Sequence, residues 1–238
     1  MTVSLTSPSV TRAIVLDIEG TTTPVEFVYQ VLFPFARTHA AAYLRREGAS
    51  AACRTAVDQL RAEQRSDRAK GLDPPNHLPE YVTWLIDRDR KSSGLKTLQG
   101  LIWQEGFRSG ELRGLVYPDV PPALNRWRAR GIDIYIYSSG SVLAQQLLFR
   151  STDAGDLTKL LAGYFDTAVG PKASSESYRV IAERLQTVPQ EILFVSDVTV
   201  ELDAAREAGF RVALCVRAAS APSDHARYPV ICSFDEVE

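Results

Sequence analysis

Cysteine and histidine are scarce in this 238-residue sequence, with three of each. The cysteines Cys53, Cys215 and Cys232 are an odd, scattered set without Cys-x-x-Cys spacing. This pattern excludes a disulfide-stabilised scaffold and indicates a reducing compartment. The histidines show no metal-ligand spacing either, so they predict no zinc site.

An excess of charge of one sign is also missing. Lys and Arg number 27 and Asp and Glu number 29, which gives a net charge of −2. No basic excess points to nucleic acid, and no polybasic segment points to a membrane surface. The first twelve residues lack the apolar core of a secretory signal, and apolar runs such as 212–216 are too short to span a bilayer. We expect a cytoplasmic protein and, because no interface stripe stands out, a monomer.

Several motifs of nucleotide and ester chemistry are absent. The sequence has no Gly-rich P-loop, no Gly-x-Gly-x-x-Gly fingerprint and no Gly-x-Ser-x-Gly elbow. The composition is that of an ordinary globular protein, 45% hydrophobic and 24% charged. A chain of this length can form a sizeable core, and its length predicts one or two domains.

Short apolar runs alternate with helical patterns over much of the chain. Runs typical of strands buried on both faces lie at 13–16, 132–137, 192–195 and 210–216, with a weaker one at 164–169. Segments with helical spacing lie at 122–130, 142–149, 175–185 and 201–208. This alternation predicts an α/β fold with a doubly wound, Rossmann-like parallel sheet.

The segment from about residue 24 to 114 breaks this rhythm. It is rich in Ala, Arg, Gln, Glu and Leu, with few strand-like runs; 49–70 is helical in pattern throughout, and the polar, Pro-containing stretch 71–79 predicts a loop. We therefore expect a helical insertion at 24–114 in a discontinuous α/β core made of 1–23 and 115–238.

Polar side chains follow four of the predicted strands. In open α/β sheets, ligands bind beyond the carboxyl ends of the strands, where such residues meet. The groups at these ends are two acidic residues after the first strand, a hydroxyl pair after the second, a lysine after the weak strand and an acidic pair after the fourth: Asp17 and Glu19, Ser138 and Ser139, Lys172, and Asp197 and Glu201.

This set fits phosphoryl transfer through a covalent aspartyl phosphate. Asp17 can act as the nucleophile once the charge of the phosphate is neutralised. Asp17 and Asp197 could hold Mg²⁺, which prefers carboxylates, carbonyls and water, while Lys172 and Ser138 contact the phosphoryl oxygens. Glu19, two residues beyond Asp17, is placed to protonate the leaving oxygen and later to activate water.

Each of these residues alone has a simpler interpretation. An Asp or Ser after a strand is most often a helix cap or turn residue, a lone Lys is most often a solvated charge, and Glu201 suits the first turn of a helix. The prediction of a site depends on their joint occurrence at the ends of several strands of one sheet.

The motifs resemble those of the haloacid dehalogenase superfamily of phosphatases. Its Asp-x-Asp-x-Thr motif appears as Asp17-Ile-Glu19-Gly-Thr21, followed by Ser138, Lys172 and the acidic pair. The glutamate, with the stretches 16–24, 135–142 and 172–178, is similar to the enolase-phosphatase branch of methionine salvage, the acireductone synthases. This similarity runs through nearly the whole chain, and the helical segment matches less well in detail.

The resemblance implies an activity and assigns the site. The branch converts 2,3-diketo-5-methylthiopentyl-1-phosphate through an enol phosphate to the acireductone, with one Mg²⁺ per chain. It implies that Asp17 and Glu19 are catalytic. It implies a metal site of Asp17, Asp197 and Glu19, the last through its backbone carbonyl, and phosphate binding by Ser138, Ser139 and Lys172. Glu201 is ranked below Asp197, because it could serve only to orient Lys172 or a metal-bound water.

The resemblance also implies that the helical insertion is a cap over the substrate. Phe27, Trp103 and Phe107 could touch the methylthio end of the substrate, although an interpretation as cap core is favoured. Glu19 is a candidate for the enolisation base. Two alternatives stay open: a phosphatase of the same superfamily with another small phosphorylated substrate, and a non-catalytic protein that binds phosphorylated metabolites.

Overall fold

A computed structural model describes residues 10–217 and 227–237. The described residues fall into two compact units. The α/β unit lies within Met1–Pro24, Val116–Val142 and Asp156–Glu238, and the helical unit consists of Val25–Leu115 and Leu143–Gly155. The segment at 143–155, which the sequence interpretation assigned to the α/β core, is thus grouped with the helical unit.

A six-stranded sheet forms the centre of the α/β unit. Every strand pair is parallel, and the strand order is β3-β2-β1-β4-β5-β6. The strands are β1 (Ala13–Leu16), β2 (Asp133–Tyr137), β3 (Gly163–Phe165), β4 (Ile192–Ser196), β5 (Arg211–Cys215) and β6 (Val230–Ile231). The prediction of a doubly wound parallel sheet is confirmed.

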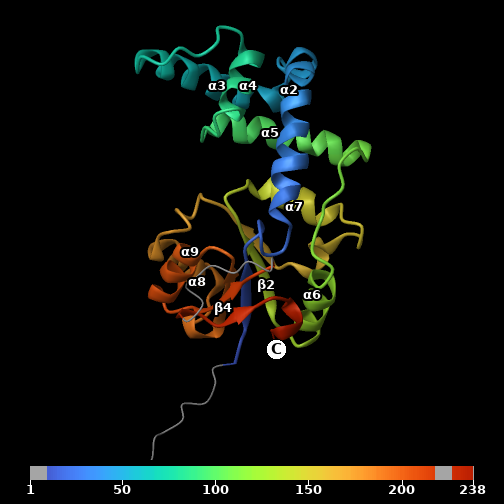
Figure 1. Ribbon diagram of the computed structural model, residues 1–238, viewed down its shortest axis with the longest axis vertical. Helices are drawn as coiled ribbons and strands as arrows, with labels where there is room; N and C mark the ends of the chain where they lie inside the picture. Colours follow the sequence, from blue (N-terminus) through green and yellow to red (C-terminus); the bar gives the residue numbers. More distant parts are fainter. Residues whose placement is uncertain (1–9, 218–226, 238) are drawn as a thin grey trace, which may run out of the picture. The chain divides into compact units, whose positions relative to one another are not determined.

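Helices cover both faces of this sheet. Figure 1 shows α8 (Ser175–Leu185) and α9 (Thr199–Glu207) on one side and α6 (Val120–Ala129) on the other. Successive residues of β1 point to opposite faces of the sheet, as side chains do along any strand. Ala13 and Val15 belong to a core shared with Tyr178 and Leu202 of the helices. All four residues of β1 are buried, as expected for a central parallel strand.

The sequence misplaced three features of these elements. The weak strand expected at 164–169 ends at Phe165, because the next residues form a turn in which the Val169 N–H bonds to the Asp166 carbonyl. The predicted loop at 71–79 is shorter, since α4 (Leu78–Ile86) begins inside it. The two-residue strand β6 was not predicted, because so short a run carries no pattern.

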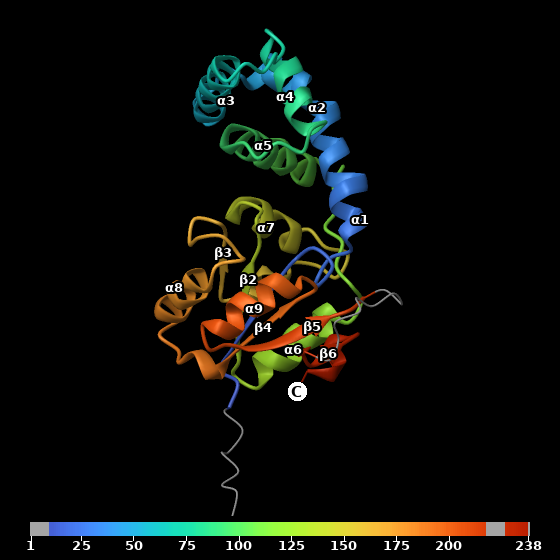
Figure 2. The same ribbon diagram turned by 60° about the vertical axis from the view of Figure 1, so that its left-hand side comes forward.

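The helical unit has a core of its own. It contains α1 (Val25–Phe27), a π-helix (Val28–Leu32), α2 (Phe33–Glu47), α3 (Ala51–Ala69), α4, α5 (Ser93–Ser109) and most of α7 (Val142–Arg150). Within it, α3 and α5 lie side by side (Figure 2). Gly94 permits this approach, because a Cβ there would lie 2.7 Å from the Leu60 backbone nitrogen. No helix in the described ranges is both long and apolar enough to cross a membrane.

Candidate active site

The residues after β1 form a tight turn at the carboxyl end of the sheet. The Asp17 N–H bonds to the Val195 carbonyl of β4 at 3.0 Å, so the chain stays paired one residue beyond the strand. Three successive N–H groups, those of residues 21–23, then converge on the Ile18 carbonyl at 2.9–3.2 Å. Gly20 has a φ of +72°, which a residue without a Cβ adopts at little cost. The turn therefore fixes Asp17 and Glu19 at the sheet edge.

Lys172 lies between two carboxylates. Its Nζ is 2.5 Å from Asp17 Oδ1 and 2.7 Å from Glu201 Oε2, and all three side chains are largely buried. Burial alone lowers the pKa of Lys172, but Asp17 and Glu201 raise it more, so the pKa lies above its ordinary value and the amine stays charged. Two carboxylates that lie far from Lys172 in the sequence are thus joined by one buried cation.

Two tyrosines fix the chain around Lys172. The Tyr178 hydroxyl on α8 donates to the Lys172 carbonyl at 2.8 Å, and the Tyr137 hydroxyl at the end of β2 donates to the Gly170 carbonyl at 3.0 Å. The Lys172 Nζ also lies 5.7 Å from the centre of the Tyr137 ring. These contacts hold the connection between β3 and Lys172, which lacks regular structure of its own.

Ser196 is a site residue that the sequence interpretation did not single out. Its Oγ lies 3.3 Å from Asp17 Oδ2 and 3.0 Å from Glu201 Oε2, and it accepts a hydrogen bond from the Val198 N–H. A hydroxyl has one proton, so it can donate to only one of these carboxylates at a time. A serine at the end of a strand is too common to stand out in a sequence; only the fold shows that this one bridges two acidic groups.

The remaining acidic groups titrate above their ordinary range. Burial, followed by repulsion from Asp17, raises the pKa of Asp197 to about 6 and that of Glu201 to about 7. The same causes, in the same order, raise the pKa of Glu19. Because one lysine does not balance four neighbouring carboxyl groups, this edge of the sheet favours an additional cation.

The two predicted hydroxyl residues, Ser138 and Ser139, differ in their exposure to solvent. Ser138 follows β2 and is buried, and its Oγ accepts a hydrogen bond from the Gly140 N–H at 3.1 Å. Ser139 is exposed. The Gly140 bond leaves the Ser138 hydroxyl proton for another partner, while the Ser139 side chain faces solvent.

The donor set suits a hard cation. The buried Oδ1 of Asp197 has no hydrogen-bond partner, although a buried carboxylate oxygen normally has one. A Cβ at Gly20 would lie 2.2 Å from Asp197 Oδ2, so the glycine leaves room for this carboxylate beside the turn. No three His, Cys, Asp or Glu side chains gather as metal ligands anywhere in the described chain. Two side-chain carboxylates with a backbone carbonyl and water still fit Mg²⁺, which retains several waters when bound.

Comparison with known proteins gives matches to one hydrolase family over most of the chain. A model of the haloacid dehalogenase-like hydrolases matches residues 11–209. Enolase-phosphatase E1 of Synechococcus elongatus is 49% identical over 230 residues, which cover 94% of this chain and 96% of that protein. Enolase-phosphatase E1 of Klebsiella pneumoniae strain 342 is 47% identical over 226 residues, covering 95% and 96%.

Solved structures show the same fold. The crystal structure of the UTR4 protein of Saccharomyces cerevisiae matches with a TM-score of 0.78 and 31% identity, over 95% of this chain and 100% of that one. CbbY of Rhodobacter sphaeroides, solved in complex with phosphate, has a TM-score of 0.60 and 18% identity, over 95% and 96% of the two chains. The second match concerns the fold alone.

Proposed function

This chain belongs to the haloacid dehalogenase-like hydrolases, and we propose that it is an enolase-phosphatase of methionine salvage. The observation that carries this function is the identity of 47–49% with enolase-phosphatases over nearly the full length. The substrate is then 2,3-diketo-5-methylthiopentyl-1-phosphate, which is first enolised and then dephosphorylated to the acireductone. We expect it to act in the cytoplasm as a monomer.

Phosphate removal would proceed through Asp17. A carboxylate oxygen of Asp17 attacks phosphorus, the bond from phosphorus to the substrate oxygen breaks, and the electron pair stays on that oxygen. Glu19 in its protonated form gives its proton to the leaving oxygen. Water then attacks the aspartyl phosphate and loses a proton to Glu19, which restores both residues. Burial, followed by repulsion from Asp17, raises the pKa of Glu19, and this direction supports its assignment as the residue that carries the proton.

Phosphate binding is assigned to three residues at neighbouring strand ends. Lys172 supplies a fixed positive charge whose orientation is set by Asp17 and Glu201. The Ser138 hydroxyl and groups at Ser139 would donate hydrogen bonds to the phosphoryl oxygens. Glu201 would then orient Lys172, which is one of the two roles expected for it.

Asp17 and Asp197, with the backbone carbonyl of Glu19, would hold one Mg²⁺. When bound, it supplies positive charge that stabilises phosphoryl and enolate oxygens. The unpartnered Asp197 oxygen and the raised pKa of Asp197, due to burial and Asp17, support this assignment. In the enolisation, a base must take the carbon-bound proton; a nearby carboxylate can do so, and Glu19 is the proposed base.

A time course with the diketo phosphate and Mg²⁺ tests this function. Enol absorbance and free phosphate are followed together, with a matched sample containing EDTA. We expect the enol to appear first, phosphate second, and neither in EDTA. Phosphate release from other esters but not from this substrate would favour a phosphatase of the same family with another small metabolite. No turnover of any phosphate ester would favour a non-catalytic binding protein.

A further inference from the structure

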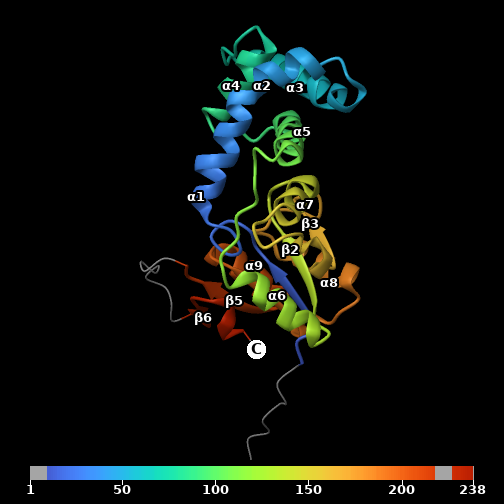
Figure 3. The same ribbon diagram turned by 90° about the vertical axis from the view of Figure 1, so that its right-hand side faces the viewer.

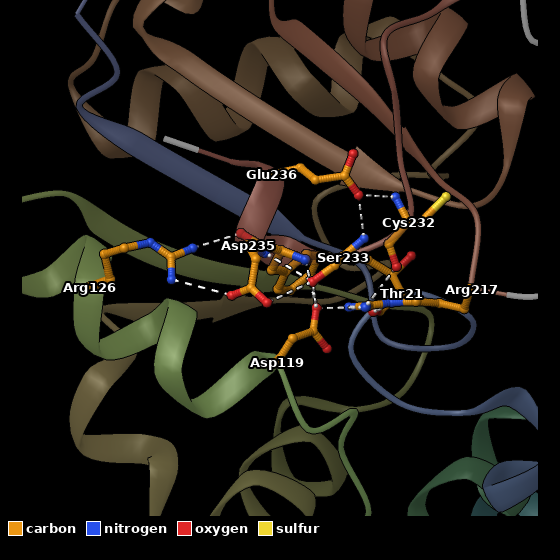
Figure 4. Close-up of polar contacts among 9 residues, drawn as sticks. Thr21, Asp119, Arg126, Arg217, Cys232, Ser233, Asp235 and Glu236 are labelled. Atoms are coloured by element: carbon orange, nitrogen blue, oxygen red, sulfur yellow. Dashed lines mark hydrogen bonds and ion pairs between the residues drawn. The ribbon is translucent and has the colours of Figure 1, made fainter.

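A largely buried arginine from a distant part of the chain binds the turn that carries Asp17 and Glu19. Arg217 lies two residues beyond β5, and its Nε donates to the Thr21 carbonyl at 2.9 Å (Figure 4). The N–H groups of residues 21–23 are used within the turn, where all three bond to the Ile18 carbonyl. The Thr21 carbonyl is therefore a point at which a distant part of the chain can fix the position of the turn.

Arg217 is itself rigidly held. Its side chain is only 8% exposed, and Nη1 lies 2.6 Å from Asp119 Oδ2 and 3.3 Å from the Cys232 carbonyl. The guanidinium also lies over the rings of Tyr117 and Phe234, 4.4 Å and 4.6 Å from their centres. A planar group fixed by hydrogen bonds and ring contacts has little freedom to move, so it can position the carbonyl that it contacts.

Asp119 ties this arginine to the C-terminal segment 230–237. The same Oδ2 accepts hydrogen bonds from the Phe234 N–H at 2.6 Å and from the Ser233 hydroxyl at 3.2 Å. Figure 3 shows this segment beside α6, the helix that Asp119 precedes. The contacts thus run from the C-terminal segment through Asp119 and Arg217 to Thr21, four positions after Asp17.

We propose that Arg217 is a positioning residue for the reaction, which sets the turn of Asp17 and Glu19 through the Thr21 carbonyl. The inference rests on the proposed function. The phosphate-binding residues Ser138 and Lys172 follow other strands, so Arg217 acts on the reacting groups more than on substrate binding. A small displacement of a nucleophile is costly, since about 1 Å reduces a rate by roughly 100-fold.

Arg126 provides a matched control. It holds the same C-terminal segment, with Nη2 donating to the Phe234 carbonyl at 2.7 Å and Nη1 lying 3.6 Å from Asp235 Oδ1 (Figure 4). These contacts all lie in the C-terminal segment rather than in the turn. A substitution of Arg126 therefore loosens the segment while leaving the Thr21 carbonyl bound.

The test compares Arg217→Lys with Arg126→Ala at a temperature well below both unfolding midpoints. Lysine keeps the charge but loses the planar fork. We expect Arg217→Lys to lower kcat for phosphate release at least 10-fold with KM changed less than threefold. Hydrogen exchange at the amides of residues 21–23, followed by NMR, should become at least 10-fold faster. Arg126→Ala should lower Tm while kcat stays within twofold and these amides exchange as before.

Two results would overturn the proposal: unchanged kcat and exchange in Arg217→Lys, or equal changes in the two variants. If Arg217→Lys does not fold, Asp119→Asn serves instead, because it keeps Arg217 and removes its charged partner; the same direction with a smaller change is expected. The exchange measurement needs no substrate. It therefore decides the positioning role even if the diketo phosphate proves not to be the substrate.

Discussion

At the scale of the residue, the main feature of the candidate site is the arrangement of acidic groups around Lys172. Lys172 is shared by Asp17 and Glu201, while Asp197 and Glu19 form no ion pair within the part of the chain that the structure describes. Burial, followed by repulsion from Asp17, raises the pKa of Asp197, Glu19 and Glu201, because a buried carboxyl group beside another negative charge favours its protonated form. Asp17 and Glu201 are thus paired with Lys172, whereas Asp197 and Glu19 have no cationic partner among the described residues.

Asp17→Asn is the most direct test of the covalent mechanism. An amide oxygen is a poor nucleophile, so phosphate release should fall by roughly 10⁴-fold or more, as for loss of other catalytic nucleophiles. The fold should persist, because asparagine keeps the shape of the side chain. Initial rates of phosphate release measure the effect, and a circular dichroism spectrum checks the fold.

Asp153→Asn is the control, because that carboxylate is 76% exposed and paired only loosely with Arg113 at 3.4 Å. Its rate should equal that of the parent protein. Substantial residual turnover in Asp17→Asn would rule out an aspartyl phosphate.

Gly20→Ala should displace Asp197. A Cβ at this position would meet Asp197 Oδ2 at 2.2 Å and would also have to adopt a φ of +72°. We expect at least 10-fold weaker Mg²⁺ binding by calorimetry and a matching loss of activity at limiting Mg²⁺.

Gly131→Ala separates the two effects. Gly131 has a φ of +76°, but nothing lies within 4 Å of its added Cβ. Both variants should lose about 1–2 kcal/mol of stability from the left-handed backbone, and only Gly20→Ala should lose Mg²⁺ affinity. Equal Mg²⁺ affinity in the two variants would contradict the placement of Asp197 in the metal site.

At the scale of the element, the C-terminal segment depends on a buried ion pair. Asp119 accepts from the Phe234 N–H, and its pair with Arg217 is largely buried. Burial alone raises the pKa of Asp119, but the Phe234 N–H and Arg217 outweigh it, so the pKa lies below its ordinary value. A carboxyl group with a lowered pKa stabilises the fold above its pKa in the unfolded chain, about 4, and this stabilisation disappears as the pH falls through the lower folded value.

Asp119→Asn should therefore reduce both the stability and its dependence on acid. We expect about 2 kcal/mol less free energy of unfolding at pH 7, the size of a hydrogen bond to a charged group. The fall in stability as the pH drops below about 4 should be shallower than in the parent protein. Urea denaturation at a series of pH values measures both quantities.

Asp235→Asn is the matched control for this prediction, because Asp235 lies in the same segment with its side chain 68% exposed. Its free energy of unfolding should change by less than about 0.5 kcal/mol, as for most surface substitutions. A parallel pH profile for Asp119→Asn and the parent protein would show that the Asp119 pair does not stabilise the fold.

At the scale of the whole molecule, the chain consists of two units with separate cores. Trp103 illustrates the helical one: it is buried, stacks with Phe33, and its indole N–H donates to the Leu32 carbonyl at 2.8 Å. Phe27 and Phe107 are buried as well. Their burial fits the interpretation of these aromatic residues as core of the helical unit.

Mg²⁺ should stabilise the folded chain by mass action. The proposed ligands Asp17 and Asp197 lie far apart in the sequence, so only the folded state brings them together. At an Mg²⁺ concentration 100 times its Kd, the free energy of unfolding should rise by about 2.7 kcal/mol. Thermal unfolding with and without Mg²⁺ measures the shift.

Asp197→Asn should abolish this stabilisation, whereas Asp203→Asn, on the partly exposed side of α9 beside Arg206, should preserve it. An unfolding midpoint that does not respond to Mg²⁺ in the parent protein would argue against the metal site. Ca²⁺ in place of Mg²⁺ separates binding from activity, since it can stabilise the fold without supporting turnover.

Local sequence was enough to predict the parallel α/β sheet and the acidic, hydroxyl and lysine residues at its strand ends. Apolar runs predict buried strands, and parallel strands bring their carboxyl ends to one edge, so the sequence alone groups Asp17, Lys172 and Asp197. The Asp17-Ile-Glu19 motif is contiguous, and one short stretch of sequence therefore suffices to identify it.

The partners of these residues, by contrast, follow only from the tertiary structure. Ser196 bridges Asp17 and Glu201, and Arg217 reaches Thr21 across 196 positions of sequence. Neither the contact of Ser196 with Asp17 nor that of Arg217 with Thr21 has a local pattern. A hydrogen bond between distant segments depends on the register of neighbouring strands and on the path of the connections between them. The residues proposed to react lie in short motifs, whereas the contacts that hold those motifs in place come from packing distant parts of the chain together.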